Sequence, residues 1–286
     1  MNYRHAFHAG NFADIVKHAV LALALAYLKG KDTPLRVIDS HAGAGLYDLG
    51  AAEAARTGEW RGGIGRLWDA ALPDAAAAAL APLMRVVRDL NPGGELRLYP
   101  GSPEIARRLA RPQDRLLFCE AREDDRGLLA GLMAGDRRAK VLATDGWVSL
   151  KAYLPPPERR GIVLVDPPFE APGEFDRMRG ALGLAAQKWP GGTYLLWYPV
   201  KDIRATDAFA RAAGRCGLDD VWRLEMLVRS PRDASRLNGT GLILVNPPWT
   251  LADDLAALMP ALTDRLADGD GARWRYDRLS PARPRK

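Results

Sequence analysis

The sequence predicts an α/β fold built on a doubly wound, mostly parallel sheet. Short apolar segments rich in β-branched residues alternate with segments of helical periodicity, the pattern of repeated strand–helix–strand units. Four of the apolar segments are followed at once or within a few residues by an acid, namely Asp39, Glu120, Asp145 and Asp166. Because the carboxyl ends of parallel strands meet at one edge of such a sheet, these acids are expected around a single ligand site.

The first hundred residues predict a helix, a strand and a helical insertion. Asn11 can cap a helix that extends to about Lys29, with apolar residues at helical spacing on its buried face. Residues 35–39 form the expected first strand, and a loop of small residues follows it. Residues 50–90 contain helical stretches but no convincing strand, so we interpret residues 47–96 as a helical insertion.

The remaining chain predicts alternating helices and strands. Ser102 is expected to cap a helix whose first residue is Pro103. Further strands are expected at 116–119, 140–143, 161–165, 193–197, 221–228 and 241–245. Residues 1–46 and 97–286 would then form the main domain. Within it, residues from about 272 to 286 are rich in Pro and Arg and predict a flexible basic tail.

The charge of the chain favours a polyanionic partner. The 286 residues carry a formal net charge of +6 and are rich in arginine. Arginines cluster at 107–111, 137–138 and 159–160 as well as in the tail. Phosphate contacts supply the sequence-independent part of nucleic-acid affinity, so nucleic acid is the natural candidate, although charge alone does not separate RNA from DNA.

Composition also predicts a cytoplasmic protein without a structural metal. No apolar run approaches the ~20 residues that span a bilayer, and the first residues lack a signal-peptide core. The two cysteines form no CxxC motif, which argues against a disulfide framework and a zinc site. All four histidines lie within the first 41 residues, but their spacing matches no common ligand set, so we expect them to border an active-site cleft.

The segment Asp166-Pro167-Pro168-Phe169 indicates the chemistry. It follows a buried strand, and the two prolines stop the strand because neither ring can donate a backbone N–H. The Asp166 carboxylate and the Pro167 carbonyl can accept hydrogen bonds from an exocyclic amino group, while Phe169 can stack on the attached ring. This tetrapeptide is typical of amino methyltransferases that use S-adenosyl-L-methionine. A proline turn with Asp166 as a helix cap is the plain structural alternative.

A second segment of the same kind competes with the first. Asn246-Pro-Pro-Trp249 also follows an apolar strand. An amino methyltransferase needs its cofactor strands before the catalytic loop, and three candidate cofactor loops precede Asp166. Too little chain remains after Asn246 for the other strands, so we assign catalysis to Asp166 and expect Asn246 to close the last strand.

The glycine loop suits S-adenosyl-L-methionine better than a nicotinamide cofactor. Gly43 and Gly45 fit the dinucleotide fingerprint, but Asp48 stands where its last glycine belongs. We expect Glu120 to bind ribose hydroxyls and Asp145 with Gly146 to contact the cofactor's adenine. Asp14, Lys17 and His18 share one helix face, and Lys17 is expected to meet the cofactor's carboxylate.

Together these motifs resemble the bacterial family of large-subunit ribosomal RNA adenine-N6 methyltransferases J. The resemblance is carried by residues 3–18, 41–45, 99–103, 166–170, 197–200 and 246–249, in family order. It implies a class I methyltransferase (Rossmann-like) fold with a mostly parallel seven-stranded sheet and a small helical insertion. The implied activity is methyl transfer to N6 of one adenosine in 23S rRNA, taken as protein-free RNA or in an early assembly intermediate.

The resemblance also implies roles for individual residues. Asp166 would be catalytic together with Pro167 and Phe169, and Tyr3, His5 and Phe169 would contact the substrate. The cofactor would be bound by Lys17, His18, His41, Gly43, Ser102, Glu120, Asp145 and Gly146. Such families commonly carry Tyr at the position of Phe169, so stacking is retained here but a phenol hydroxyl is not.

Three alternatives remain open at the level of sequence. A DNA amino methyltransferase shares the chemistry of the loop, and a protein glutamine methyltransferase uses a similar loop for an amide group. An RNA-binding assembly factor with a vestigial cofactor site is the alternative from a different class. Methyl transfer to protein-free RNA but not to duplex DNA separates the RNA enzyme from the DNA methyltransferase. The basic surface argues against the protein methyltransferase, and the intact acids and glycines argue against the vestigial site.

Overall fold

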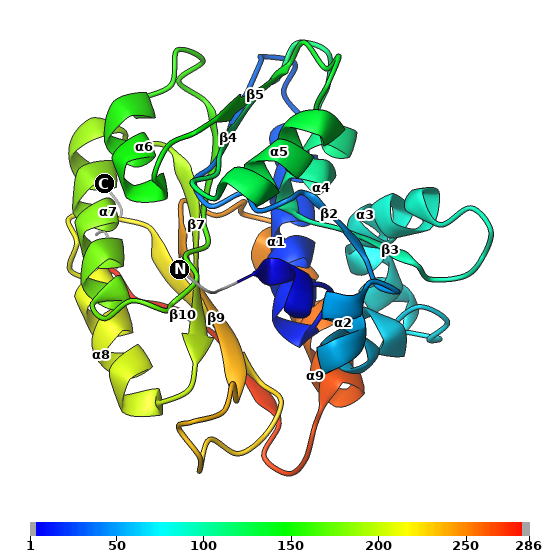
Figure 1. Cartoon of the computed structure of the whole chain (residues 1–286). Helices are drawn as coiled ribbons and strands as arrows, with labels where there is room; N and C mark the ends of the chain where they lie inside the picture. The colour runs from blue at the N-terminus through cyan, green and yellow to red at the C-terminus, as the bar shows by residue number, and fades with distance from the viewer. Residues whose placement is uncertain (1–3, 282–286) are drawn as a thin grey trace.

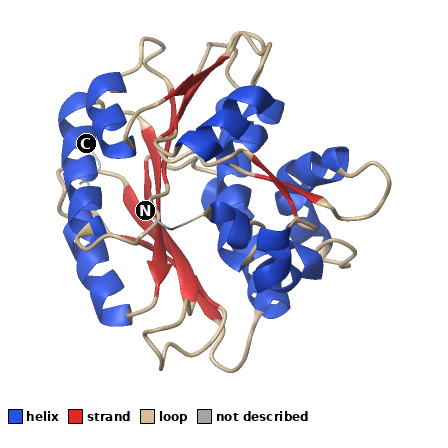
Figure 2. Ribbon diagram, viewed as in Figure 1, coloured by secondary structure: helices blue, strands red, loops and turns tan. Residues whose placement is uncertain are grey.

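The computed structural model describes residues 4–281 and shows a sheet with helices on both faces (Figures 1 and 2). Tyr3 and residues 282–286 lie outside the described residues. The sheet has eight strands in the order β10-β8-β9-β7-β6-β1-β4-β5. The strands are β1 (Arg36–Asp39), β4 (Arg115–Cys119), β5 (Ala139–Leu142), β6 (Gly161–Val165), β7 (Thr193–Val200), β8 (Val221–Leu227), β9 (Gly239–Val245) and β10 (Arg273–Arg278).

The sheet divides into a parallel half and an antiparallel half. β1 lies between β6 and β4 and is parallel to both, and β5 and β7 extend the parallel half on either side. β9, β8 and β10 follow in antiparallel pairing. Four of the seven pairings are therefore parallel, as predicted. The chain moves from β1 to β4 and β5 and then returns to β6 on the other side of β1, which creates a topological switch point there.

The prediction of seven strands was wrong, because part of the expected basic tail forms β10. Arg273–Arg278 pairs antiparallel with β8 in full register. Its side chains alternate between two environments, as strand geometry requires. Trp274 and Tyr276 pack against the hydrophobic core, whereas Arg275 on the opposite face binds the carboxylates of Glu225 and Asp207. Two arginines of the expected flexible tail, Arg275 and Arg278, are thus ion-paired members of a strand.

Two hydrophobic cores cover the two faces of the sheet. Adjacent residues of β1 point into different cores, Val37 into one and Ile38 into the other. One face is covered by α1 (Phe12–Leu28), α4 (Ser102–Leu109), α5 (Glu123–Leu132) and α9 (Leu251–Leu266). The other is covered by α6 (Gly146–Tyr153), α7 (Glu174–Lys188) and α8 (Ile203–Ala213).

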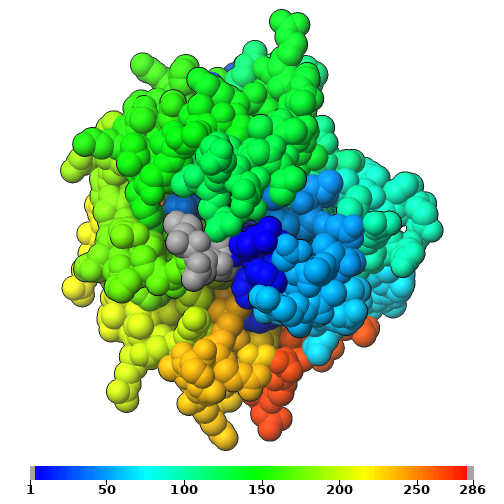
Figure 3. Space-filling model, in the orientation of Figure 1, coloured from blue at the N-terminus to red at the C-terminus, as the bar shows by residue number. Residues whose placement is uncertain are grey.

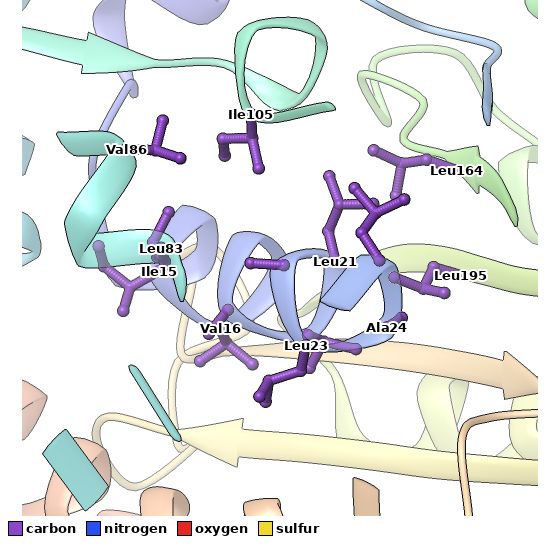
Figure 4. Close-up of a cluster of buried hydrophobic side chains, with 14 of the residues drawn as sticks. Ile15, Val16, Leu21, Leu23, Ala24, Leu83, Val86, Ile105, Leu164 and Leu195 are labelled. Carbon is purple, nitrogen blue, oxygen red and sulfur yellow. The ribbon is translucent and has the colours of Figure 1, made fainter. Parts of the chain in front are cut away.

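Helix α1 is the central helix of the first core. The side chain of Asn11 accepts hydrogen bonds from the backbone N–H groups of residues 13 and 14, which confirms the predicted cap. Figure 4 shows Ile15 beside Leu83 and, further along the helix, Leu21 near Leu164 of the sheet. Almost every α1 side chain is buried, including three that are polar: Asp14, Lys17 and His18. Buried charges are costly unless they are paired, so these three residues point to a functional centre.

The segment between β1 and β4 is largely helical, as expected. It contains α2 (Ala52–Thr57), two short 3-10 helices and α3 (Asp74–Leu90), framed by the short antiparallel strands β2 (Leu46–Asp48) and β3 (Leu98–Pro100). α3 packs on α1 and α9 through fully buried residues such as Leu83 and Val87. The division of the chain at residues 47 and 96 stays a prediction. None of the helices within residues 4–281 is long and apolar enough to cross a bilayer.

Candidate active site

A pocket of about 370 Å³ lies at the carboxyl edge of the parallel strands. Loops that follow β1, β4, β5 and β6 all contribute to its wall, so the pocket lies at the switch point beside β1. The structure brings together nearly all of the predicted site residues that it describes. Those that line the pocket are His5, Lys17, His18, His41, Gly43, Ser102, Glu120, Asp145, Gly146 and Asp166.

Asp39, the last residue of β1, is buried next to the pocket and binds Ser102, which lines it. The Ser102 hydroxyl donates to Oδ2 of Asp39 over 2.6 Å, and the backbone N–H of His41 donates to Oδ1. Burial raises the pKa of Asp39 to about 7, although the Ser102 hydrogen bond opposes the rise. The predicted cap was wrong by one residue, because α4 begins at Ser102 and its N-cap is Gly101. The hydroxyl is therefore used across the site instead of within its helix.

The glycine loop and Glu120 are joined by backbone hydrogen bonds. The N–H of Gly43 donates to Oε2 of Glu120 at 2.8 Å, and the N–H of Arg122 donates to Oε1 at 2.7 Å. Each carboxylate oxygen keeps a second lone pair for a ligand hydroxyl. Gly43 has φ of +63°, and a Cβ there would lie 2.5 Å from the Tyr47 hydroxyl. A glycine at position 43 therefore lets the loop adopt this backbone conformation and pass close to the Tyr47 side chain.

The loop after β5 closes one end of the pocket. Oδ1 of Asp145 caps α6 by accepting from the N–H groups of residues 147 and 148, so the capping role considered from sequence is real. The same residue and Gly146 also line the pocket. A Cβ at Gly146 would lie 2.5 Å from the ring of His41. Burial lowers the pKa of His41 to about 4, so the ring is neutral, and it packs edge-on against Trp147.

An ion cluster links α1 to the loop after β6. Nζ of Lys17 lies 2.5 Å from Oδ2 of Asp166 and 2.9 Å from Oδ1 of Asp14. His5 contacts the same Asp14 through Nε2 at 2.9 Å. Burial would lower the pKa of Lys17, but the two carboxylates raise it well above its usual value. Lys17 lines the pocket as expected, but in the structure its ammonium group is bound by two protein carboxylates.

His18 lines the pocket as a neutral side chain. Its Nδ1 lies 2.9 Å from the Tyr99 hydroxyl, and the two rings stack. Burial lowers the pKa of His18 to about 3. Tyr99 belongs to residues 99–103, one of the segments that carry the family resemblance, and it is fully buried. This segment therefore contributes to the site through the contact of Tyr99 with His18.

Phe169 is half-buried against an aromatic cluster. Its ring meets Phe175 and Trp197 edge to face, with centroids 5.1 and 5.9 Å away. Its φ of +52° is unusual for a bulky residue and marks a constrained loop. Pro168 lines the pocket, whereas Pro167 and Phe169 are absent from its described lining. The predicted stacking of Phe169 on a base stays a prediction.

The second Pro-Pro segment lies at the opposite edge of the sheet. Asn246 follows β9, which runs antiparallel to β7, and Val245 pairs with Tyr194 near the start of β7. Its side-chain amide donates to the carbonyl oxygens of residues 190 and 192. Asn246 thus joins the loop after β9 to the loop before β7. It does not end the last strand of the sheet, because β10 follows it in the chain.

Several pocket residues were not selected from the sequence. They include Tyr47, Cys119, Trp147, Pro168, Glu174 and Arg177. Trp147 and Pro168 adjoin predicted residues and could have been found from that adjacency. Tyr47 and Glu174 come from β2 and the start of α7, whose positions depend on packing that no local pattern reveals. The described residues include no group of three or more His, Cys, Asp or Glu side chains suited to a metal.

The pocket fits a cofactor that carries a nucleoside and an amino acid. Its volume falls in the range of small-molecule sites, and it presents acids to hydroxyl and amino groups beside a closely approached glycine loop. Strand order, pocket position and the Asp-Pro-Pro loop after β6 together define a class I methyltransferase, an enzyme that uses S-adenosyl-L-methionine. The family model described as "Ribosomal RNA large subunit methyltransferase D, RlmJ" matches residues 32–278, and the chain belongs to this family.

Two relatives and a solved structure agree with this membership. The "Ribosomal RNA large subunit methyltransferase J" of Haemophilus influenzae is 38% identical over 98% of this chain and 99% of its own. The Escherichia coli protein of the same name is 39% identical over 93% of this chain and 94% of its own. A crystal structure of a Legionella pneumophila protein superposes with a TM-score of 0.86 at 33% identity, covering 95% of this chain and 98% of that one.

Proposed function

We propose that this enzyme transfers the methyl group of S-adenosyl-L-methionine to N6 of one adenosine in 23S ribosomal RNA. The observation that carries the proposal is the position of Asp166, which lines the cofactor-sized pocket at the end of β6 and precedes two prolines. The printed names of the relatives, large-subunit ribosomal RNA methyltransferases, support the RNA. Such a substrate places the enzyme in the cytoplasm, where ribosomes assemble.

The cofactor side of the pocket is supplied by the loops after β1, β4 and β5. Glu120 is placed to accept hydrogen bonds from ribose hydroxyls, because each of its oxygens keeps a lone pair. Asp145 and Gly146 would meet the cofactor's adenine, and the neutral ring of His41 lies beside Gly146. Asp39, Ser102 and His18 would bound the amino-acid end. When bound, the cofactor supplies a methyl group on a positively charged sulfur.

The target side is supplied by Asp166 and Pro167. An aromatic amine is a poor nucleophile because its lone pair is delocalised into the ring. Hydrogen bonds from the N6 amino group to Asp166 and to the Pro167 carbonyl favour a more pyramidal nitrogen that points at the methyl group, and positioning of this kind supplies much of the rate. Lys17 holds Oδ2 of Asp166, which leaves Oδ1 for the amino group. After methyl transfer the nitrogen is positively charged and its proton has become acidic, so the proton passes to the Asp166 carboxylate or to water.

The adenine has to leave its helical stack to reach Asp166. Unstacking costs a few kcal/mol unless the base is already unpaired. We assign Phe169 the role of offsetting part of this cost by stacking, about 1–3 kcal/mol. His5 lines the pocket and touches Asp14, so it and Tyr3, the neighbour two residues before it, are proposed to contact the nucleotide.

Tritiated methyl transfer to protein-free fragments of 23S rRNA, followed by nucleoside analysis, tests the proposal. N6-methyladenosine in a single fragment is the expected product, and the Asp166→Ala protein serves as the control. Methylation of duplex DNA in place of RNA would support the alternative of a DNA amino methyltransferase. Cofactor binding without transfer to any nucleic acid would support a binding factor and overturn the proposal.

A further inference from the structure

The arginine clusters noted in the sequence lie away from the pocket. Residues 107–111 end α4 just before β4, and residues 137–138 and 159–160 precede β5 and β6. All three therefore lie at the amino edge of the parallel strands. Several of these arginines also have internal partners: Arg107 and Arg108 both bind Glu104, and Arg138 binds Asp136. These clusters therefore lie at the edge of the sheet opposite the pocket, so we do not expect them to bind the RNA backbone next to the target base.

Another set of cations lies at the carboxyl edge, where the pocket opens. β7 runs parallel to β6 and extends beyond it to Val200, so Lys201 lies on the same edge as Asp166. The loop from 229 to 238 joins β8 to β9 at this edge, because Gly239 pairs with both Val200 and Leu227. Figure 3 shows this yellow-orange segment on the face that also carries the dark blue N-terminal segment, which contributes His5 to the pocket.

The loop is held in shape by its own hydrogen bonds. Asn238 is buried, and its amide donates to the carbonyl oxygens of Lys201 and Asp233. Asp233 accepts from the backbone and hydroxyl of Ser235. The guanidinium of Arg229 binds the carbonyl of Leu237 and the carboxylate of Asp268. A loop fixed in this way loses little conformational entropy when it binds a partner.

Three cationic side chains of this edge are free to bind a ligand, although the charge of Arg236 also acts on the neighbouring carboxylate of Asp233. Lys201, Arg232 and Arg236 are exposed, and within residues 4–281 none of the three side chains has a hydrogen bond or an ion pair. Lys201 is also close to the entrance: a hydrogen bond with Glu59 raises the pKa of His8, and the charge of Lys201 opposes that rise. His8 follows the 3-10 helix His5–Phe7, which contributes His5 to the pocket.

We propose that Lys201, Arg232 and Arg236 form a phosphate-binding surface, the edge-cation surface, that grips the RNA backbone beside the target adenosine. The inference rests on the proposed function and adds to it the location of the backbone contacts. Because the strands and the loop fix the three cations relative to Asp166, they would orient the RNA without reading its sequence. They would contribute to affinity through release of counterions and leave the chemistry of the bound base unchanged.

The test compares a triple variant, Lys201→Ala with Arg232→Ala and Arg236→Ala, with the wild-type enzyme. Dissociation constants for a 23S rRNA fragment are measured across a series of salt concentrations, together with single-turnover rates at saturating RNA. Each lost phosphate contact lowers the slope of log K against log salt by roughly 0.7–0.9. We expect the slope to fall by about 2–3 and affinity to fall at least tenfold at low salt, with an unchanged saturated rate.

Two control variants test separately whether the location of the cations and their charge determine RNA binding. Arg137→Ala with Arg159→Ala removes two exposed arginines from the amino edge and is expected to leave the salt slope unchanged. Arg232→Lys with Arg236→Lys keeps the charge and is expected to keep the slope. Cofactor affinity verifies that each variant is folded.

An unchanged slope in the triple variant would overturn the inference, as would an equal fall in the amino-edge control. A lower saturated rate with unchanged RNA affinity would also overturn it, because the residues would then act on the reacting base. Failure of the proposed function itself looks different, since the wild-type enzyme would then methylate no fragment of 23S rRNA.

Discussion

Lys17 and Asp166, 149 positions apart in the chain, meet with Nζ only 2.5 Å from Oδ2. The same ammonium group binds Asp14, one turn earlier on α1. The lysine side chain is 4% exposed, so this cluster is shielded from water and bridges the central helix and the loop that carries the proposed catalytic acid. The orientation of Asp166 therefore depends on a residue that sequence reasoning assigned to the cofactor.

Replacement of Lys17 by Met is expected to damage both stability and rate. The change leaves Asp14 and Asp166 as close carboxylates without their shared cation, and breaking a buried pair in this way typically costs about 3–5 kcal/mol. Urea unfolding and single-turnover methylation measure the two effects. Lys31→Met, which alters an exposed lysine just beyond the same helix, should change neither quantity. A stable and fully active Lys17→Met enzyme would contradict the assigned role.

Asp166→Ala is expected to abolish most methyl transfer while the cofactor still binds. Loss of a hydrogen-bonding group that acts in the transition state typically costs about 100- to 1000-fold in rate. Lys17 keeps Asp14 as a partner in this variant, so the fold should survive. Rates come from tritiated methyl transfer and cofactor affinity from calorimetry. Near wild-type turnover by the folded variant would remove Asp166 from the mechanism.

Asn246→Ala is expected to lower stability and leave the saturated rate unchanged. The substitution removes the two hydrogen bonds from Nδ2 to the carbonyl oxygens of residues 190 and 192. It also places alanine at φ of +48°, where asparagine is better tolerated. A loss of about 1–3 kcal/mol is expected from the unpaired groups, measured by urea unfolding. A large fall in rate without a fall in stability would instead favour a catalytic role for this segment.

Phe169→Tyr is expected to keep activity, whereas Phe169→Ala should lose most of it. Stacking worth about 1–3 kcal/mol corresponds to roughly ten- to a hundredfold in rate when it is expressed in the transition state. The contacts of Phe169 with Phe175 and Trp197 support a second outcome, in which alanine mainly lowers the melting temperature. Single-turnover rates and melting temperatures of the same proteins distinguish these outcomes. Full activity with an unchanged melting temperature would contradict both.

His18 is expected to make the apo-enzyme sensitive to acid. Burial lowers the pKa of His18 to about 3 in the folded protein, whereas the unfolded side chain takes up a proton near pH 6.5. The unfolded state therefore binds more protons between these values, so stability is full above pH 6.5 and falls as the pH drops toward 3. The maximum slope is about 1.4 kcal/mol per pH unit for one group.

The His18→Gln variant isolates this contribution from those of other titrating groups. Near neutral pH the variant should be less stable, because it disturbs the contact with Tyr99. Its deficit relative to the wild type should shrink as the pH falls from 6 to 4, since glutamine takes up no proton. Urea unfolding at several pH values measures the deficit, and a constant deficit would show that His18 is not held neutral.

The order of seven of the eight strands of the main sheet, and the chemistry of the loops that follow them, could be predicted from the sequence alone. Apolar strands followed by acids predicted that Glu120, Asp145 and Asp166 would meet, because parallel strands bring their carboxyl ends to one edge. The Asn11 cap, the helical segment after β1 and the alternation of strands and helices were also predicted correctly. Each of these features depends on interactions between residues that are close in the chain.

The hydrogen-bond and ion-pair partners of the polar side chains became known only from the tertiary structure. Lys17 could pair with a cofactor or with a distant carboxylate, and only the packing of α1 against the sheet brings it to Asp166. Ser102 could cap its own helix, yet its hydroxyl reaches Asp39. Arg275 belonged to a segment with the composition of a flexible tail, but two carboxylates and the edge of β8 stabilise it in a strand. Long-range electrostatic pairing leaves no local periodicity in a sequence, so these choices appear only when the chain is folded.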